Sequence, residues 1–185
     1  MKSVDSVTRQ FCSRLHRIIK DAWAGMGEDT ETRLRELIEY HISAAYFEGL
    51  TAGGIEPEDY DDEMAAEADS LVFEQFAHVE GLVVAIEEAQ NAEDKRSAVQ
   101  QRAEMWCRSV ESAGLAGLNR AKATEMVVWR VGPTEHCKTC AWLNGQKHRR
   151  KWFTDNGYIP RQAGSQTLEC NGYNCQCELV PVKKG

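Results

Sequence analysis

Five of the seven cysteines in this 185-residue chain lie in two short stretches near its C-terminus. Cys137 and Cys140 form a Cys-x2-Cys pair in HCKTCAWLNG, and Cys170, Cys175 and Cys177 form a Cys-x4-Cys-x-Cys cluster in LECNGYNCQCELVPV. A Cys-x2-Cys spacing lets one tight turn present two thiolates to a tetrahedral ion, and a second cluster supplies the remaining ligands. The pattern is typical of a structural zinc site.

The segment that holds the two clusters has few large aliphatic side chains, so it would struggle to bury a core without help. A zinc ion would stabilise it by closing the long loop between the clusters. The predicted ligands are Cys137, Cys140, Cys170 and Cys175. Cys177 is the alternate ligand, and His136 could replace one thiolate. Disulfide pairing and unliganded reduced thiols remain as alternatives.

A basic run, GQKHRRKWF, lies between the two clusters. It is the one strong positive patch in an acidic chain, and two aromatic residues follow it. The run is either a solvated loop or a contact with a phosphate backbone or an acidic partner. The residues of this candidate contact are Lys147, His148, Arg149, Arg150 and Lys151.

Enzymatic sites fit the same residues less well. A thioredoxin-like redox pair needs a βαβ context that the helical N-terminal region does not offer. A zinc deaminase needs an H-x-E pair before P-C-x-x-C, and TEHCKTC lacks that pair and the proline. Nothing fixes the geometry of a Cys/His nucleophile pair that used His136 or His148. We therefore predict that the chain is not an enzyme.

The charge is unevenly distributed. The net charge is −7, with 14 Lys and Arg against 25 Asp and Glu up to Arg130, and 8 against 4 from Val131 onward. This excludes a protein that coats nucleic acid over its whole surface, but it leaves room for a local basic contact. The N-terminus does not resemble a secretory signal, and no stretch has the length and apolarity of a membrane span. We expect a cytosol-like compartment, in which clustered cysteines stay reduced.

Residues 1 to about 125 show helical periodicity almost throughout. Four amphipathic helices are predicted, with Thr30 as the N-cap of the second. Cys12, Cys107, His16, His41 and His78 are interpreted as ordinary core or near-core residues of these helices. The apolar seams consist of Val7, Phe11, Leu15, Ile18 and Ala22; Leu34, Leu37, His41, Ala44 and Phe47; Val72, Phe76, Val79, Val83 and Ile86; and Val99, Ala103, Trp106, Val110, Ala113 and Gly117.

The character of the sequence changes at EMVVWRVGP, where a short β-prone run ends in Gly-Pro. The predicted fold class is mainly α. An antiparallel helical bundle or hairpin forms the body over residues 1–125, and a small β-containing, zinc-ribbon-like, cysteine-rich module follows over 126–185.

Two stretches of this module, WRVGPTEHCKTCAWLNGQ and GYIPRQAGSQTLECNGYNCQCELVPV, resemble the C-terminal region of the Mu F-like minor head proteins of tailed bacteriophages. In that family a strand leads into Cys-x2-Cys and Leu-x-Gly, and after an insert with prolines a Cys-x-Cys closes into a short strand. Cys170 stands near the place where the family commonly has His-Pro. The matching elements here are Cys137, Cys140, Leu143, Gly145, Pro160, Cys175, Cys177 and the strand-like residues 178–182.

The resemblance implies a virion component inside the head, near the portal, that acts in head assembly and in DNA packaging or ejection. It implies portal and major capsid proteins as partners, with packaged DNA as a further contact of the basic run, and it implies neither membrane association nor catalysis. Host cytoplasm would be the location during assembly, and a homo-oligomer is compatible with this role. The alternative is a regulatory protein with a helical dimerisation body and a zinc-ribbon reader of nucleic acid.

Overall fold

The structure is a computed structural model that describes residues 3–27, 29–91, 97–133, 135–162, 164–172 and 175–182. The protein is mainly α, with a small three-stranded sheet in a cysteine-rich C-terminal part, as predicted. The chain divides into two compact units, Met1–Gly117 and Leu118–Gly185. This division falls inside a long helix, whereas the sequence boundary at about residue 125 followed the later change to β-prone residues.

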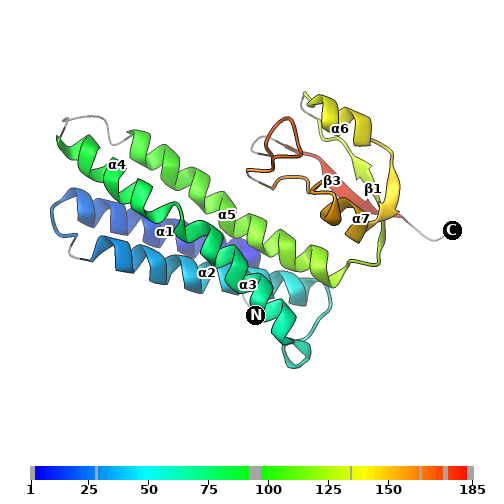
Figure 1. Cartoon of the computed structure of the whole chain (residues 1–185), viewed down its shortest axis with the longest axis horizontal. Helices are drawn as coiled ribbons and strands as arrows, with labels where there is room; N and C mark the ends of the chain where they lie inside the picture. The colour runs from blue at the N-terminus through cyan, green and yellow to red at the C-terminus, as the bar shows by residue number, and fades with distance from the viewer. Residues whose placement is uncertain are drawn as a thin grey trace. The chain divides into compact units, whose positions relative to one another are not determined.

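The first unit is a bundle of long helices, which Figure 1 shows side by side. One continuous core joins them, so the predicted apolar seams close within a single chain. No helix among the described residues is long and apolar enough to span a membrane. The elements are α1 (Val4–Trp23), α2 (Thr30–Ala52), the short 3-10 helix η1 (Pro57–Asp59), α3 (Asp62–Phe76), α4 (Val79–Asn91) and α5 (Ser97–Ala121), whose last residues belong to the second unit.

Polar side chains define where helices of this bundle begin. The Ser3 hydroxyl accepts the Ser6 N–H at the start of α1, and the Asp61 carboxylate accepts the Met64 N–H at 2.8 Å at the start of α3. The prediction of Thr30 as the N-cap of the second helix was wrong by one residue, because Asp29 holds that position with a φ of 65°. The Thr30 hydroxyl instead donates to the Gly27 carbonyl at 2.8 Å.

The third predicted helix is interrupted. Val72 and Val79 are both buried on its apolar seam, but the helix breaks between them into α3 and α4. At the break the His78 N–H donates to the Gln75 carbonyl at 3.0 Å, which is the tighter i to i−3 bond of a turn. Heptad-like spacing continues through the break, and for this reason the sequence pattern did not reveal it.

Cys12 and Cys107 form a disulfide between α1 and α5, with their Cα atoms 5.6 Å apart. Both cysteines are half-buried against the core of the bundle, as the sequence indicated. Their treatment as separate packing residues was wrong, because pairing depends on which helices become neighbours and 95 residues separate the two positions.

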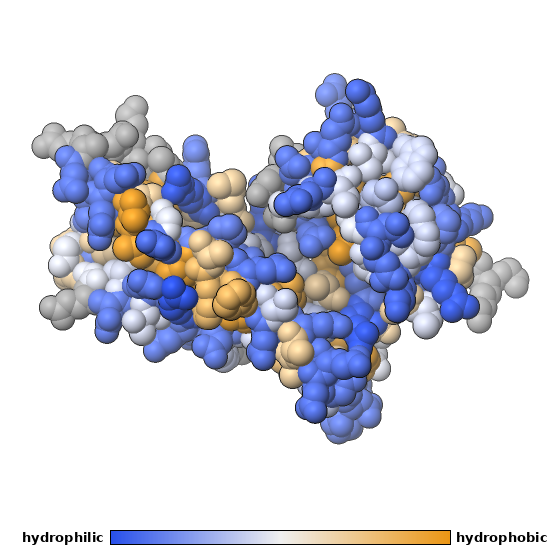
Figure 2. Space-filling view, viewed as in Figure 1, coloured by the Kyte–Doolittle hydropathy of each residue, from blue (hydrophilic) through white to orange (hydrophobic). Residues whose placement is uncertain are grey.

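The bundle also exposes apolar side chains. Phe73 on α3 is 77% exposed and Val84 on α4 is 42% exposed. Figure 2 shows apolar surface over these two helices on the face in view.

The second unit is organised around a three-stranded antiparallel sheet with the order β2-β1-β3. The central strand places Val127 opposite His148 on one side and Pro181 on the other. The strands predicted around Val127 and Glu178 are confirmed. The elements are β1 (Met126–Arg130), α6 (Lys138–Leu143), β2 (Lys147–Arg149), α7 (Arg150–Asp155) and β3 (Glu178–Pro181).

The core of this unit is small, and sulfur atoms are part of it. Its buried members are Val127, Trp129, Cys140, Leu143, Phe153, Leu168 and Cys177, with Cys137, Cys170 and Cys175 packed at its edge. Few aliphatic side chains contribute, which agrees with the expectation that this part of the chain needs a further source of stability.

Candidate metal centre

All five C-terminal cysteines lie close together as free thiols. They form two groups of three, Cys137 with Cys140 and Cys170, and Cys140 with Cys175 and Cys177. Within each group the sulfur atoms are within 4.8 Å of one another, and the Cys140 and Cys175 sulfurs are 4.0 Å apart. Cys140 is the member common to both groups, so it occupies the middle of the cluster.

The Cys-x2-Cys pair is positioned by the start of α6. Cys137 is the N-cap residue of this helix, and its sulfur accepts the Cys140 N–H at 3.4 Å. The helical turn brings Cys140 back toward the same side and buries it beside Leu143. This local geometry is the turn that the Cys-x2-Cys spacing predicts.

Cys170 reaches the pair because its neighbour Glu169 is bonded to α6. The Glu169 carboxylate accepts the Lys138 N–H at 2.9 Å, and the Glu169 N–H donates to the Thr139 hydroxyl at 3.4 Å. Next along the chain, Gly172 packs directly on the backbone of Gln162, where a Cβ would collide with a carbonyl oxygen. Its φ of 74° also favours glycine. These contacts hold the turn that carries Cys170.

Cys177 is placed by the sheet. It directly precedes β3, whose first residue Glu178 pairs with Arg130 of the central strand. Before this strand, the chain passes so close to Gly132 that a Cβ there would meet the backbone of Gln176. The pairing of β3 with β1 therefore brings Cys177 to the cluster, although it lies far along the chain from the cysteines of α6.

The three thiols of the first group differ in the direction of their pKa shifts. Burial raises the pKa of Cys140 far above its usual range. Hydrogen bonds with neighbouring cysteines and repulsion from their thiolates raise this pKa further. Burial also raises the pKa of Cys170. Burial acts in the same direction on Cys137, but hydrogen bonds from Cys140 and Cys170 outweigh it and lower the pKa of Cys137 overall. A cluster of this kind gathers negative charge readily only beside a cation.

The donor set suits a soft metal ion. Thiolates favour zinc, copper(I) and iron-sulfur chemistry over magnesium or calcium. Sulfur ligands around a tetrahedral zinc, with Zn–S bonds of about 2.3 Å, lie about 3.8 Å from one another. The 4.0 Å separation of the Cys140 and Cys175 sulfurs is close to that edge. The cysteine cluster can therefore hold a metal ion.

The structure brings together every cysteine proposed as a ligand. Cys177, predicted only as an alternate, is buried in the same group as Cys140 and Cys175. His136, the other candidate for replacing a thiolate, is exposed and is in neither group. The role of Glu169 was not predicted, although its position directly before Cys170 was the available signal.

One interpretation of the basic run was a solvated loop. The run does not form a loop, because β2 and α7 form there. Lys147, Arg149 and Lys151 are exposed, and His148 is half-buried. Arg150 is only 5% exposed, so it is not part of the basic surface. Its guanidinium points inward, where it donates to Asn119 at 3.0 Å and to Glu125 at 2.8 Å.

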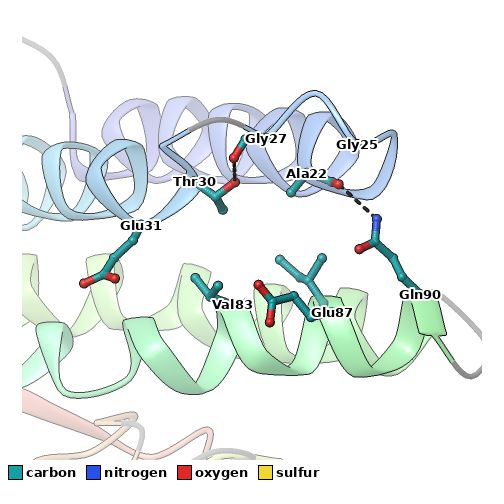
Figure 3. A pocket seen from close by; sticks show the side chains of 9 residues that line it. Ala22, Gly25, Gly27, Thr30, Glu31, Val83, Glu87 and Gln90 are labelled. Carbon is teal, nitrogen blue, oxygen red and sulfur yellow. Dashed lines mark hydrogen bonds between the residues drawn. The ribbon is translucent and has the colours of Figure 1, made fainter.

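A pocket of about 400 Å³ lies in the helical unit, between the end of α1, the start of α2 and the side of α4 (Figure 3). The Gln90 amide donates to the carbonyls of Ala22 and Trp23 at 3.0 and 2.7 Å, which satisfies the C-terminal end of α1. Glu31 and Glu87 are among the lining residues, and Glu31 is paired with Arg35. Sequence reasoning placed Ala22 on an apolar seam but did not single out Glu31, Glu87 or Gln90.

Fold and site together define a helical bundle followed by a small cysteine-rich module that can hold a metal ion. Comparisons with protein-family models, curated proteins and solved structures give no match to this chain. A function has to be argued from the residues themselves.

Proposed function

We propose that the second unit is closed by a structural zinc ion and that the chain serves as a minor head protein of a tailed bacteriophage. In this role it acts inside the head near the portal, in assembly and in DNA packaging or ejection. The sequence resemblance of Cys137, Cys140, Leu143, Cys175 and Cys177 to the Mu F-like pattern supports the role in the head.

The convergence of five thiols from two distant segments carries the proposal of the metal. Zinc is favoured because tetrahedral thiolate sites are its usual structural environment. Four thiolate ligands leave no open position for water, so the ion would stabilise the fold and would not act on a substrate. The small core supports this, since closing a long loop adds most to a unit that buries little apolar surface.

Two of the residues that carry the family resemblance also help to hold the second unit together. Leu143 is fully buried, and Gly145 has a φ of 84° in the turn between α6 and β2. The Gly145 N–H donates to the Trp129 carbonyl at 2.9 Å, which ties this turn to the central strand. The Leu-x-Gly element thus joins the cysteine pair to the sheet.

The two units also differ strongly in charge. Met1–Gly117 contains 11 Lys and Arg against 24 Asp and Glu, and Leu118–Gly185 contains 11 against 5. Opposite charges on two units of one chain suit an adaptor that contacts different surfaces. This supports a role in assembly.

Metal analysis of the protein purified without chelator tests the site. We expect about one zinc per chain. Cys140→Ser should abolish zinc binding because Cys140 belongs to both thiol groups. Four of the five cysteines would bind the ion, and serine in place of the fifth should leave the zinc stoichiometry unchanged. Cys12→Ser, which lies outside the cluster, is the matched control. Absence of metal in the unaltered protein, or full zinc content in Cys140→Ser, would contradict the proposal.

Co-expression with the portal and major capsid proteins of a tailed bacteriophage tests the role in the head. We expect the chain to co-sediment with assembled heads and to be protected inside them from added protease. Cys140→Ser should reduce this incorporation if the closed second unit makes the contact. Heads that assemble without incorporating the chain would overturn the assignment, whatever the metal content.

A further inference from the structure

The three-stranded sheet has one face that the core of the second unit does not cover. Residues directly opposite each other in antiparallel strands share a face, and the faces alternate along each strand. Val127, Trp129 and Leu179 therefore point toward the core, and all three contribute to its hydrophobic cluster. The register places seven residues on the opposite side, which we call the outer face: Met126, Val128, Arg130, Lys147, Arg149, Glu178 and Val180.

Apolar side chains occupy the middle of the outer face. Val128 lies directly opposite Val180, and Met126 comes two residues earlier on β1. Neither hydrophobic cluster of the described residues contains any of the three. Met126 is 45% exposed and Val180 is half-buried, whereas the solvated face of an antiparallel sheet usually carries polar side chains. Packing of the core does not account for these three residues, so they mark a surface that a partner can cover.

Positive charge lies beside the apolar residues on the same face. Lys147 is directly opposite Val128, and Arg149 is directly opposite Met126. Side chains in such pairs have Cβ atoms about 4.5–5.5 Å apart, so each cation is a neighbour of an apolar side chain. Both cations are exposed, and no salt bridge among the described residues involves them. Their charges are therefore free for a partner.

The size of the outer face suits a single helix. Three strands about 4.8 Å apart are about 10 Å wide, close to the diameter of an α-helix with its side chains. Strand β1 has five residues, so the face is about 14 Å long, which is the rise of about two and a half helical turns. Arg130 and Glu178 are opposite each other at one end and offset each other in charge. The excess positive charge is thus at the β2 edge.

We propose that the outer face is a docking surface for an acidic amphipathic helix of a partner protein. Apolar side chains of that helix would contact Met126, Val128 and Val180, and its carboxylates would pair with Lys147 and Arg149. The apolar middle favours a protein over nucleic acid, because a phosphate backbone gains nothing from contact with valine or methionine. This surface contains none of the thiols, and a partner for it goes beyond the proposed role in the head.

Binding of a labelled synthetic peptide to the full chain, followed by fluorescence anisotropy, tests this surface. The peptide is a cross-linked helix of about three turns, with leucine along one face and glutamate elsewhere. We expect Lys147→Glu combined with Arg149→Glu to weaken binding by about tenfold or more, because attraction becomes repulsion. Met126→Glu should weaken it by about tenfold, because a carboxylate would then lie against the leucines.

Lys151→Glu is the matched control. Lys151 is an exposed cation of the same basic run, but it belongs to α7 and lies outside the outer face. Its reversal should change binding by less than about twofold, since salt screens a charge at a distance. A peptide with lysine in place of glutamate should bind the Lys147→Glu, Arg149→Glu variant better than the unaltered chain. This exchange separates lost recognition from unfolding.

Equal loss in Lys151→Glu and in the double variant, or no detectable binding of the peptide at low salt, would overturn the proposal. Equal binding of a scrambled peptide, with the leucines spread around the helix, would do the same. Tighter binding of a DNA duplex that needs Lys147 and Arg149 but not Met126 would assign the face to nucleic acid instead. A native mass that rises with concentration, and no longer does so in Met126→Glu, would assign it to a second copy. Either result would overturn the proposal.

Discussion

Arg150 shows how far the environment of a residue departs from its sequence context. It sits in a run of cations that resembles a surface patch, yet its guanidinium is buried between Asn119 and Glu125. Its own N–H donates to the Glu125 carbonyl at 2.8 Å, so Arg150 ties the first turn of α7 to the segment before β1. A charged residue in this position holds elements together and does not recruit a ligand.

Arg150→Met should therefore destabilise the second unit, whereas Arg149→Met should not. Loss of the guanidinium leaves Glu125 and Asn119 without their partner, at a cost of about 2–3 kcal/mol. Arg149 is exposed, and its substitution should change stability by less than about 0.5 kcal/mol. Hydrogen exchange of the β1 amides measures both effects in the full chain. Equal protection in the two variants would show that the buried pair contributes nothing.

At the residue scale, sequence reasoning found the cysteines because their spacing itself encodes a turn. Cys137 and Cys140 need only local geometry to meet, and α6 provides it. It could not distinguish Arg150 from Arg149, because burial of one of two adjacent arginines depends on partners 25 and 31 residues away. Sequence reasoning missed the disulfide between Cys12 and Cys107 for the same reason, because the two cysteines are 95 residues apart.

At the scale of elements, two glycines in helices of the bundle have opposite surroundings. Gly117 on α5 packs directly against α2, where a Cβ would collide with the Tyr46 carbonyl and lie 2.9 Å from the Leu50 nitrogen. Gly81 on α4 faces open space. Glycine is thus required for the close approach of α5 to α2, and at position 81 it only weakens its helix.

Gly117→Ala should destabilise the bundle by about 1–3 kcal/mol, because backbone atoms of α2 cannot move aside as a side chain would. Gly81→Ala should stabilise it by about 0.5 kcal/mol through helix propensity. Urea unfolding followed by far-UV circular dichroism compares the two variants. A stabilising effect of Gly117→Ala would mean that α2 and α5 are further apart than the structure places them.

The elements themselves were predictable where periodicity is long. The buried seams of α1 and α5 follow closely from the spacing of their apolar residues. The predicted seam of α2 was only partly right, because Ala44 and Phe47 are half-buried while Tyr46 and Leu50 are buried. The three residues of β2 were missed because Lys147 and Arg149 face away from the core and only His148 faces inward. Three residues are too few to show a pattern of alternating polar and apolar side chains. The strand forms because it pairs with β1, which depends on the fold and not on the local sequence.

At the scale of the whole molecule, the two units combine opposite net charges with different stabilising links. A disulfide joins α1 to α5 in the first unit, and free thiols form the candidate metal centre in the second. Both links connect segments that are distant in sequence, so each would restrict the unfolded chain as well as hold the folded one. Different reagents should therefore act on different units.

A chelator should remove the protection of the β1 amides while the helical signal of α1 to α5 persists. A phosphine reductant should do the reverse, because opening a link across 95 residues lowers the stability of the bundle by about 2–5 kcal/mol. Hydrogen exchange resolves the two units in one sample, and Cys12→Ser should make the bundle insensitive to the reductant. If either reagent unfolded both units together, the chain would be one cooperative body and its two links would not act separately.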